Sequence, residues 1–145
     1  MTIREATPAD LLMILSLYLD LHETDIPAAD ERLWRTWDTI LSDENHHLIV
    51  CEEDEKIVSS CVCVIVPNLT RNVRPYALIE NVVTAEDCRG RGYATACLAF
   101  ARAIARKNDC YKLMLMTGAK DESTLNFYRR AGYNDVDKTA FVQWL

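Results

Sequence analysis

The sequence predicts an α/β protein built on a mixed β-sheet that contains one parallel crossover. Three observations lead to this class. Apolar residues switch between β-type and helical spacing along the chain. A short acidic turn joins two β-type segments into a hairpin, and later a strand, a glycine-rich turn, a helix and another strand follow one another. A connecting helix makes the strands that it joins parallel, whereas a hairpin makes them antiparallel.

The N-terminal part of the chain predicts one strand and two helices. Residues 2–6 (TIREA) form the opening strand. Thr7, followed by a proline, is a candidate N-cap for a helix whose leucines recur at helical spacing. A second helix is expected over residues 30–41. Its tryptophans, Trp34 and Trp37, are expected in the core or on the wall of a substrate pocket.

The middle of the chain predicts a hairpin and a further strand. The apolar run at residues 47–52 and the β-rich segment at 56–66 flank the acidic turn at 53–55. Residues 67–75 form a loop, and residues 76–84 (YALIENVVT) form the strand before the glycine turn. This strand therefore leads directly to the most informative segment of the chain.

The C-terminal part predicts two helices and two strands. An amphipathic helix covers residues 95–107, and its small residues suit close packing on a sheet. A strand over 111–117 follows, then a short helix over 121–131 that Gly132 ends at a C-cap position. Residues 139–145 (TAFVQWL) are expected to close the sheet as a terminal strand.

Composition limits the class of protein. With 145 residues, 50% hydrophobic and 26% charged, the chain fits one domain over residues 1–145. It lacks a long uncharged apolar stretch and begins without a signal-peptide pattern, so we expect a cytoplasmic protein with no membrane contact. A net charge of −6 argues against a nucleic-acid partner.

The six cysteines lack the spacing of a paired motif. In a reducing compartment they are expected to be buried free thiols. A metal site from Cys51, Cys61 and Cys63 with the pair His46 and His47 is conceivable, but the ligand spacing does not support it. We therefore expect no metal.

The glycine-rich turn at residues 89–94 (RGRGYA) lies between a strand and a helix N-terminus. Unpaired backbone N–H groups and the helix dipole make such a turn an anion site. A P-loop would need Gly-x-x-x-x-Gly-Lys-Ser/Thr, which is absent. A dinucleotide fingerprint would place Gly or Ala where Thr95 stands, and it belongs to a doubly wound sheet. A tight turn with no ligand is the remaining alternative.

Residues 89–94 match Gln/Arg-x-x-Gly-x-Gly/Ala, the pyrophosphate-binding signature of the GNAT superfamily of acyl-CoA-dependent N-acyltransferases. The chain resembles that family in element order over nearly its whole length, most closely over residues 79–133. The segments IENVV, CRGRGYA, DCYKLML and NFYRRAGY are similar to glucosamine-6-phosphate N-acetyltransferases. The resemblance implies a mostly antiparallel mixed sheet, splayed at its central parallel strands and flanked by about four helices.

The resemblance also implies where acetyl-CoA binds. The strand before the signature would pair its backbone with the pantetheine amides, and the turn would hold the pyrophosphate. The residues implied are Val82, Val83 and Thr84 on the strand and Arg89, Gly90, Arg91, Gly92, Tyr93, Ala94 and Thr95 on the turn. Glycines allow close backbone approach there. Either arginine could instead be a solvated surface group.

Acyl transfer to an amine needs a base and an acid, and two residues suit these roles. Glu80 lies in an otherwise apolar strand, two residues before Val82 and on the same face by the period of two. We expect it to be partly buried and to act as the general base, unless it forms a structural salt bridge. Tyr128 matches the family's FYxxxGF segment, which implies that its hydroxyl reprotonates the coenzyme thiolate. A packing tyrosine is the alternative.

The family's usual coenzyme-binding Asn is replaced here. The positions seven and four before Tyr128 hold Asp121 and Thr124, which share its helix face. Asn126 is expected to point the other way. Thr124 could substitute by its hydroxyl.

The sequence says least about where the amine acceptor binds. Arg71 and Arg74 lie in the loop that leads to the strand of Glu80, where two guanidinium groups could bind a phosphate or carboxylate. A solvated loop is equally compatible with the sequence.

The sequence thus predicts an N-acetyltransferase that transfers an acetyl group from acetyl-CoA to a small primary amine by direct attack in a ternary complex. Catalysis by a cysteine nucleophile is disfavoured because Cys88 borders the pyrophosphate turn and Cys97 faces the packing side of its helix. A non-catalytic acyl-CoA sensor and a protein acetyltransferase are the alternatives. A homodimer is plausible, since Phe141, Val142 and Trp144 offer apolar surface near the C-terminus.

Overall fold

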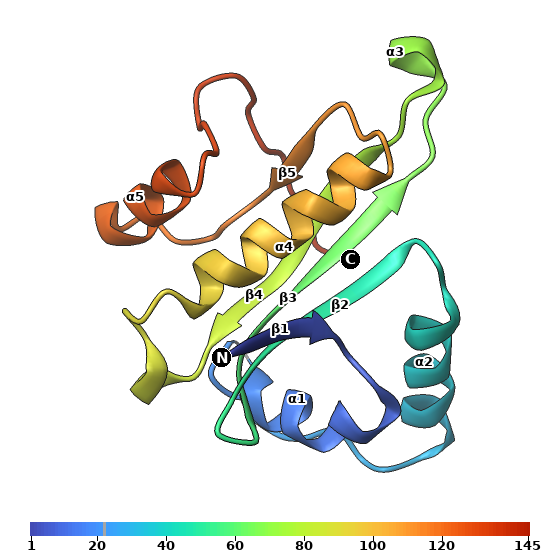
Figure 1. Ribbon diagram of the computed structural model, residues 1–145, viewed down its shortest axis with the longest axis vertical. Coiled ribbons are helices and arrows are strands. Elements are labelled where there is room, and N and C mark those ends of the chain that lie inside the picture. The colour runs from blue at the N-terminus through green and yellow to red at the C-terminus, as the bar shows by residue number, and fades with distance from the viewer. Residues whose placement is uncertain (22) are drawn as a thin grey trace.

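The computed structural model describes residues 1–21 and 23–145 and contains one five-stranded sheet in the order β1-β2-β3-β4-β5 (Figure 1). The strands are β1 (Thr2–Glu5), β2 (His46–Glu53), β3 (Lys56–Val66), β4 (Tyr76–Thr84) and β5 (Leu113–Leu115). Three neighbouring pairs are antiparallel, and β4 and β5 are parallel. The predicted mixed sheet with a single parallel crossover is therefore confirmed.

Within these described residues, five helices accompany the sheet: α1 (Leu11–Tyr18), α2 (Glu31–Ser42), the one-turn α3 (Thr70–Val73), α4 (Tyr93–Lys107) and α5 (Glu122–Arg130). Short 3₁₀ turns, η1 (Pro8–Asp10) and η2 (Glu86–Cys88), precede α1 and α4. Aspartates begin two of the helices. Asp30 accepts from the Leu33 amide at 3.0 Å, and Asp121 accepts from the Thr124 amide at 2.9 Å.

A buried ion cluster ties the first strand to the first helix. Asp10, which is 2% exposed, accepts hydrogen bonds of 2.6 and 2.9 Å from Arg4 and one of 2.6 Å from the Thr7 amide. Arg4 also donates to Glu52 on β2. These contacts lower the pKa of Asp10 to about 2, with the Arg4 hydrogen bonds as the largest cause.

The sheet carries a hydrophobic core on each face, which gives three layers. One core packs α4 against β2, β3 and β4, with α5 at its margin, and α4 crosses the sheet in Figure 1. The other core holds α1 and α2. Trp37 is buried in this second core, whereas Trp34 is 48% exposed, so the core prediction holds for Trp37 alone.

A β-bulge interrupts β4 in its middle. Ser60 on β3 pairs with Val83 and Val62 pairs with Glu80, so two residues of β4 face one residue of β3. Asn81 takes the left-handed backbone conformation there, with a φ of 51°. The extra residue changes the strand's alternation. Val82 therefore contributes to the core under α4, and Val83 contributes to the core under α1 and α2.

Two predicted strands differ from the structure. Residues 139–145, all of them described, form neither strand nor helix, and Phe141 and Trp144 are 90% and 92% exposed. The strand predicted over 111–117 is shortened to β5, which pairs only with residues 77–79. The terminal-strand prediction was wrong because a strand needs a partner edge as well as a suitable pattern.

The cysteines are free thiols, four of them buried and two, Cys88 and Cys110, partly exposed. Among residues 1–21 and 23–145, no group of three or more His, Cys, Asp or Glu side chains is placed to hold a metal. Within the same ranges, no helix is both long enough and apolar enough to cross a membrane.

Candidate active site

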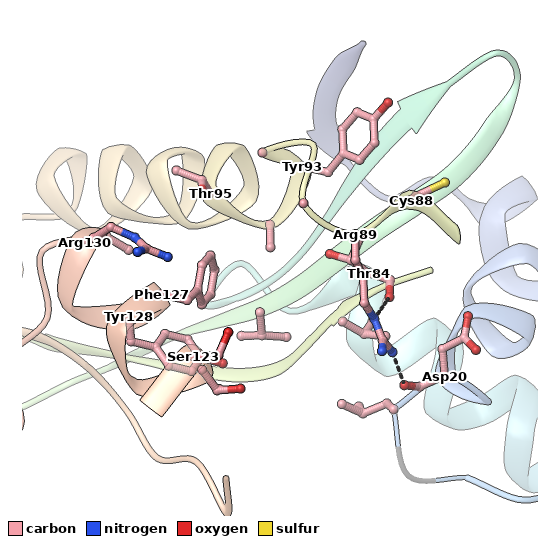
Figure 2. A pocket seen from close by; sticks show the side chains of 18 residues that line it. Asp20, Thr84, Cys88, Arg89, Tyr93, Thr95, Ser123, Phe127, Tyr128 and Arg130 are labelled. Atoms are coloured by element: carbon pink, nitrogen blue, oxygen red, sulfur yellow. Dashed lines mark hydrogen bonds between the residues drawn. The ribbon is translucent and has the colours of Figure 1, made fainter. Parts of the chain in front are cut away.

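A groove of about 550 Å³ lies between the C-terminal half of β4, the turn before α4, and α5 (Figure 2). This volume is within the usual range of small-molecule sites. The groove brings together predicted residues from three separate segments of the chain: Val82, Val83, Thr84, Arg89, Gly90, Gly92, Tyr93, Ala94, Thr95, Thr124 and Tyr128.

The floor of the groove is an open strand edge. β5 pairs with β4 only as far as Ile79, although β4 continues to Thr84. The edge of residues 80–84 that points away from β3 is therefore left without a ladder partner among the described residues. Unpaired backbone N–H and C=O groups in a row can bind an extended ligand as an added strand.

The glycine turn continues this edge into the N-terminus of α4. Gly90 and Gly92 have φ values of 75° and 87°, where a residue with a Cβ is strained. An added Cβ at either position would meet nothing within 4 Å, so backbone conformation explains the glycines, not crowding within the chain.

The first turn of α4 offers free N–H groups. Gly92 caps the helix without a side-chain hydrogen bond, and the first bond into the helix runs from the Ala96 amide to the Gly92 carbonyl at 3.0 Å. The amides of the three residues between them thus have no partner in the described part of the chain and can bind an anion. Tyr93 contributes its backbone only, because its side chain is 9% exposed and points away from the groove in Figure 2.

The two arginines of the turn have different positions. Arg89 lines the groove and donates to the backbone carbonyls of Thr84 at 3.3 Å and Asp20 at 3.5 Å. Both acceptors are carbonyl oxygens, so its charge is still available to a ligand. Arg91 is exposed, lies outside the set of lining residues and donates to the Asp87 carbonyl at 3.0 Å. The solvated alternative therefore fits Arg91.

Helix α5 forms the opposite wall and carries Tyr128. Its ring packs edge-on against Phe127 and Tyr133, at centroid distances of 4.9 and 6.3 Å. Burial raises the pKa of the Tyr128 hydroxyl above its ordinary value, so the group is protonated at neutral pH. Thr124 lies on the same wall, whereas Asn126 accepts a hydrogen bond from Arg129 and does not line the groove.

The structure corrects the expected surroundings of Glu80. Its side chain is exposed and is not one of the residues that line the groove. The bulge at Asn81 places Glu80 and Val82 on opposite faces of the strand, since the extra residue breaks the period of two. The expectation of a partly buried carboxylate beside Val82 was therefore wrong.

The structure also places Arg71 and Arg74 away from the groove. Both residues precede β4, whereas the groove lies along its C-terminal half. At about 3.3 Å per residue, the groove begins roughly 20 Å from the start of the strand. Arg71 lies over the ring of Tyr111 at 5.6 Å, and Arg74 pairs with Asp109 at 3.2 Å. The two arginines are thus near the strand of Glu80 in the sequence but far from the groove in space.

Several lining residues were not anticipated. Ala131 comes three residues after Tyr128 and shares its helix face, so helical spacing could have identified it. Ser123 and Phe127 are four residues apart on a neighbouring row of α5, which spacing from Tyr128 does not mark. Asp20 and Leu21 come from the turn just after α1, and nothing in the local sequence marks them.

Neither cysteine near the groove is placed to act as a nucleophile. A hydrogen bond with Cys61 lowers the pKa of Cys97, but this thiol is fully buried in the core and out of reach of a substrate. Cys88 lines the groove, and desolvation, with a smaller contribution from Asp87, raises the pKa of its thiol. A raised pKa lowers the fraction of thiolate, which is the reactive form.

Comparison with known proteins now decides the family. The model of the acetyltransferase (GNAT) family matches residues 11–133. The chain belongs to the GNAT family. A solved structure from Agrobacterium tumefaciens, described as an acetyltransferase, superposes with a TM-score of 0.93 at 37% identity, over 100% of both chains.

Two curated relatives also match this GNAT chain. An N-acetyltransferase of Methanocaldococcus jannaschii without a characterised function is 28% identical over 99% of this chain and 64% of its own length. A glucosamine 6-phosphate N-acetyltransferase of Trypanosoma brucei brucei is 35% identical over 54% of this chain and 51% of its own length. The chain thus spans between half and two thirds of these relatives. GNAT proteins use acetyl-CoA.

Proposed function

We propose that this protein is an N-acetyltransferase that transfers an acetyl group from acetyl-CoA to a primary amine of a small molecule. One observation carries the proposal: an unpaired strand edge, a glycine turn and Tyr128 line a single groove. The edge suits pantetheine, the turn suits a pyrophosphate, and Tyr128 is then near the end where the thioester would lie.

The proposed residues hold the coenzyme in three ways. Backbone groups of Val82, Val83 and Thr84 would pair with the pantetheine amides. The amides of residues 90–95 would bind the pyrophosphate, with Arg89 adding positive charge. Thr124 is close enough to the groove to offer its hydroxyl in place of the family's asparagine.

The chemistry follows from the same groups. The amine nitrogen attacks the thioester carbonyl carbon, whose oxygen is polarised by backbone amides of β4, and the C–S bond breaks. Tyr128 gives its proton to the departing thiolate and later recovers one from solvent. The proton lost by the amine would pass to Glu80 through water, because that carboxylate is exposed beside the end of the open edge.

An acetyl-CoA consumption screen tests the function. We expect release of free thiol with at least one member of a panel of amino sugars, amino acids, polyamines and peptides. Coenzyme binding without consumption in any arm would favour the acyl-CoA sensor. Turnover with peptides alone would favour a protein acetyltransferase. No coenzyme binding at all would contradict the proposal.

We also propose that the protein forms a homodimer in which the second copy covers the exposed apolar side chains near the C-terminus. Phe141, Trp144 and Leu145 are each at least 90% exposed, and Val142 is 62% exposed. Aromatic side chains bury roughly 150–250 Å² each, so the tails of two copies approach the roughly 1,200 Å² of a specific interface. The outer edge of β5, at the end of the described sheet, offers backbone groups to such a tail.

Light scattering on the full chain tests the assembly. We expect a dimer, and a monomer after the double substitution Phe141→Ser and Trp144→Ser. A wild-type monomer at micromolar concentration would overturn this part of the proposal.

A further inference from the structure

A buried serine of β3 is bonded to the last two residues of the open edge of β4. Ser59 is fully buried and pairs with Thr84 across the two strands. Its hydroxyl donates to the Val83 carbonyl at 2.7 Å, and its oxygen lies 2.8 Å from the Thr84 hydroxyl oxygen. One side chain that does not line the groove therefore contacts two residues that do.

The direction of the second hydrogen bond follows from the first. A serine hydroxyl has one proton, and the Val83 carbonyl can only accept. The Ser59 proton is therefore used on Val83, and Thr84 must donate its own proton to Ser59. The side chain of Thr84 is thus fixed to β3, and its hydroxyl has no proton left to donate to a ligand.

The ladder between β3 and β4 decides which way the backbone of Thr84 points. The Ala85 amide donates to the Val58 carbonyl at 2.9 Å, and Thr84 directly precedes Ala85. Because the backbone groups of successive residues in an antiparallel strand point in alternate directions, those of Thr84 point away from β3. The Thr84 carbonyl is therefore on the open edge, where it accepts from Arg89 Nε at 3.3 Å (Figure 2).

These contacts link Ser59 to the cation of the glycine turn. Arg89 donates to the Thr84 carbonyl at 3.3 Å and to the Asp20 carbonyl at 3.5 Å. Both distances exceed the usual range of about 2.7–3.2 Å, so a small shift of Thr84 would remove the first contact. The position of the Arg89 guanidinium therefore depends on how firmly Ser59 holds Thr84 from the interior.

We propose that Ser59 is a positioning residue of the coenzyme site, which holds Val83 and Thr84 and thereby keeps the Arg89 guanidinium where a diphosphate binds. The inference rests on the proposed function, because it assigns Ser59 a part in holding the same coenzyme. Ser59 makes no contact with the ligand itself, since it is fully buried and lies outside the groove-lining set.

Calorimetry with CoA on single and double variants tests the role. We expect Ser59→Ala to raise the dissociation constant of CoA about fivefold, the size of one hydrogen bond. In an Arg89→Ala background the same substitution should change the constant by less than about twofold, because the group that Ser59 positions is gone. Thr84→Val removes the hydroxyl contact from the β4 side and should also weaken binding, so the test does not depend on Ser59→Ala folding well.

Ser60→Ala is the matched control. Ser60 is the next residue of β3, is also fully buried, and donates to the Ile49 carbonyl of β2 at 2.9 Å. Its loss removes a similar hydrogen bond on the side away from β4. We expect a lower melting temperature in both serine variants, but a changed dissociation constant only in Ser59→Ala.

Three results would overturn the inference: a dissociation constant that neither Ser59→Ala nor Thr84→Val changes, an equal rise in Ser60→Ala, or an equal effect of Ser59→Ala with and without Arg89. A wild-type protein that binds CoA but consumes no acetyl-CoA would refute the proposed function instead. The dissociation constants would then still decide whether Ser59 positions the coenzyme site.

Discussion

Replacing Tyr128 by phenylalanine removes the proposed acid and little else. The ring contacts with Phe127 and Tyr133 are made by carbon atoms, at centroid distances of 4.9 and 6.3 Å, and phenylalanine keeps them. The fold and the coenzyme site should therefore survive. A positioned acid contributes on the order of 10²–10⁴-fold, so we expect kcat to fall by at least about 100-fold.

The assay compares turnover with binding. Thiol release under saturating acetyl-CoA gives kcat, and calorimetry gives the dissociation constant of CoA, which we expect to change by less than about twofold. Tyr133→Phe is the matched control, because it removes a neighbouring hydroxyl that is buried and lies outside the groove-lining set. A Tyr128→Phe enzyme with kcat within threefold of wild type would refute the assignment of the acid.

Three further outcomes follow from the structure. Glu80→Gln should lower kcat/KM and remove the acidic limb of its pH profile, and an unchanged limb would exclude Glu80 as the base. Arg89→Ala should weaken CoA binding about tenfold at low salt and less at high salt, whereas Arg91→Ala, measured by the same calorimetry, should have little effect. The pKa of Asp10 is lowered to about 2 in the folded state. The ionised carboxylate therefore adds to the free energy of unfolding above about pH 4, and this stabilisation is lost as the pH falls towards 2. Urea unfolding should show that Asp10→Asn costs about 2 kcal/mol at pH 7 and lacks this acid-dependent loss; equal pH dependence in both proteins would contradict the account.

The sequence was most informative where local chemistry determines structure. The glycines at 90 and 92 require positive φ, and the helix that follows has a regular apolar face, so the turn and its helix could be placed correctly. The hairpin of β2 and β3 was predictable because alternation and an acidic turn agree. Helical spacing from Tyr128 also indicated Thr124, which lines the groove.

The sequence was least informative where strand register or a distant partner determines the structure. The face of the sheet on which Glu80 lies depends on the bulge at Asn81, which arises from the pairing of β3 with β4 and leaves no local pattern. The positions of Arg71 and Arg74 depend on which end of β4 forms the groove. The tail at 139–145 has a β-type pattern, but it pairs with no strand among the described residues, and the nearest end of the sheet is the three-residue strand β5.

A crystal structure of the protein with CoA tests the central claim most directly. Our account predicts pantetheine along residues 80–84, the pyrophosphate on the amides of residues 90–95, and the sulfur within hydrogen-bonding distance of the Tyr128 hydroxyl. Coenzyme bound elsewhere, or a sulfur directed away from Tyr128, would contradict it.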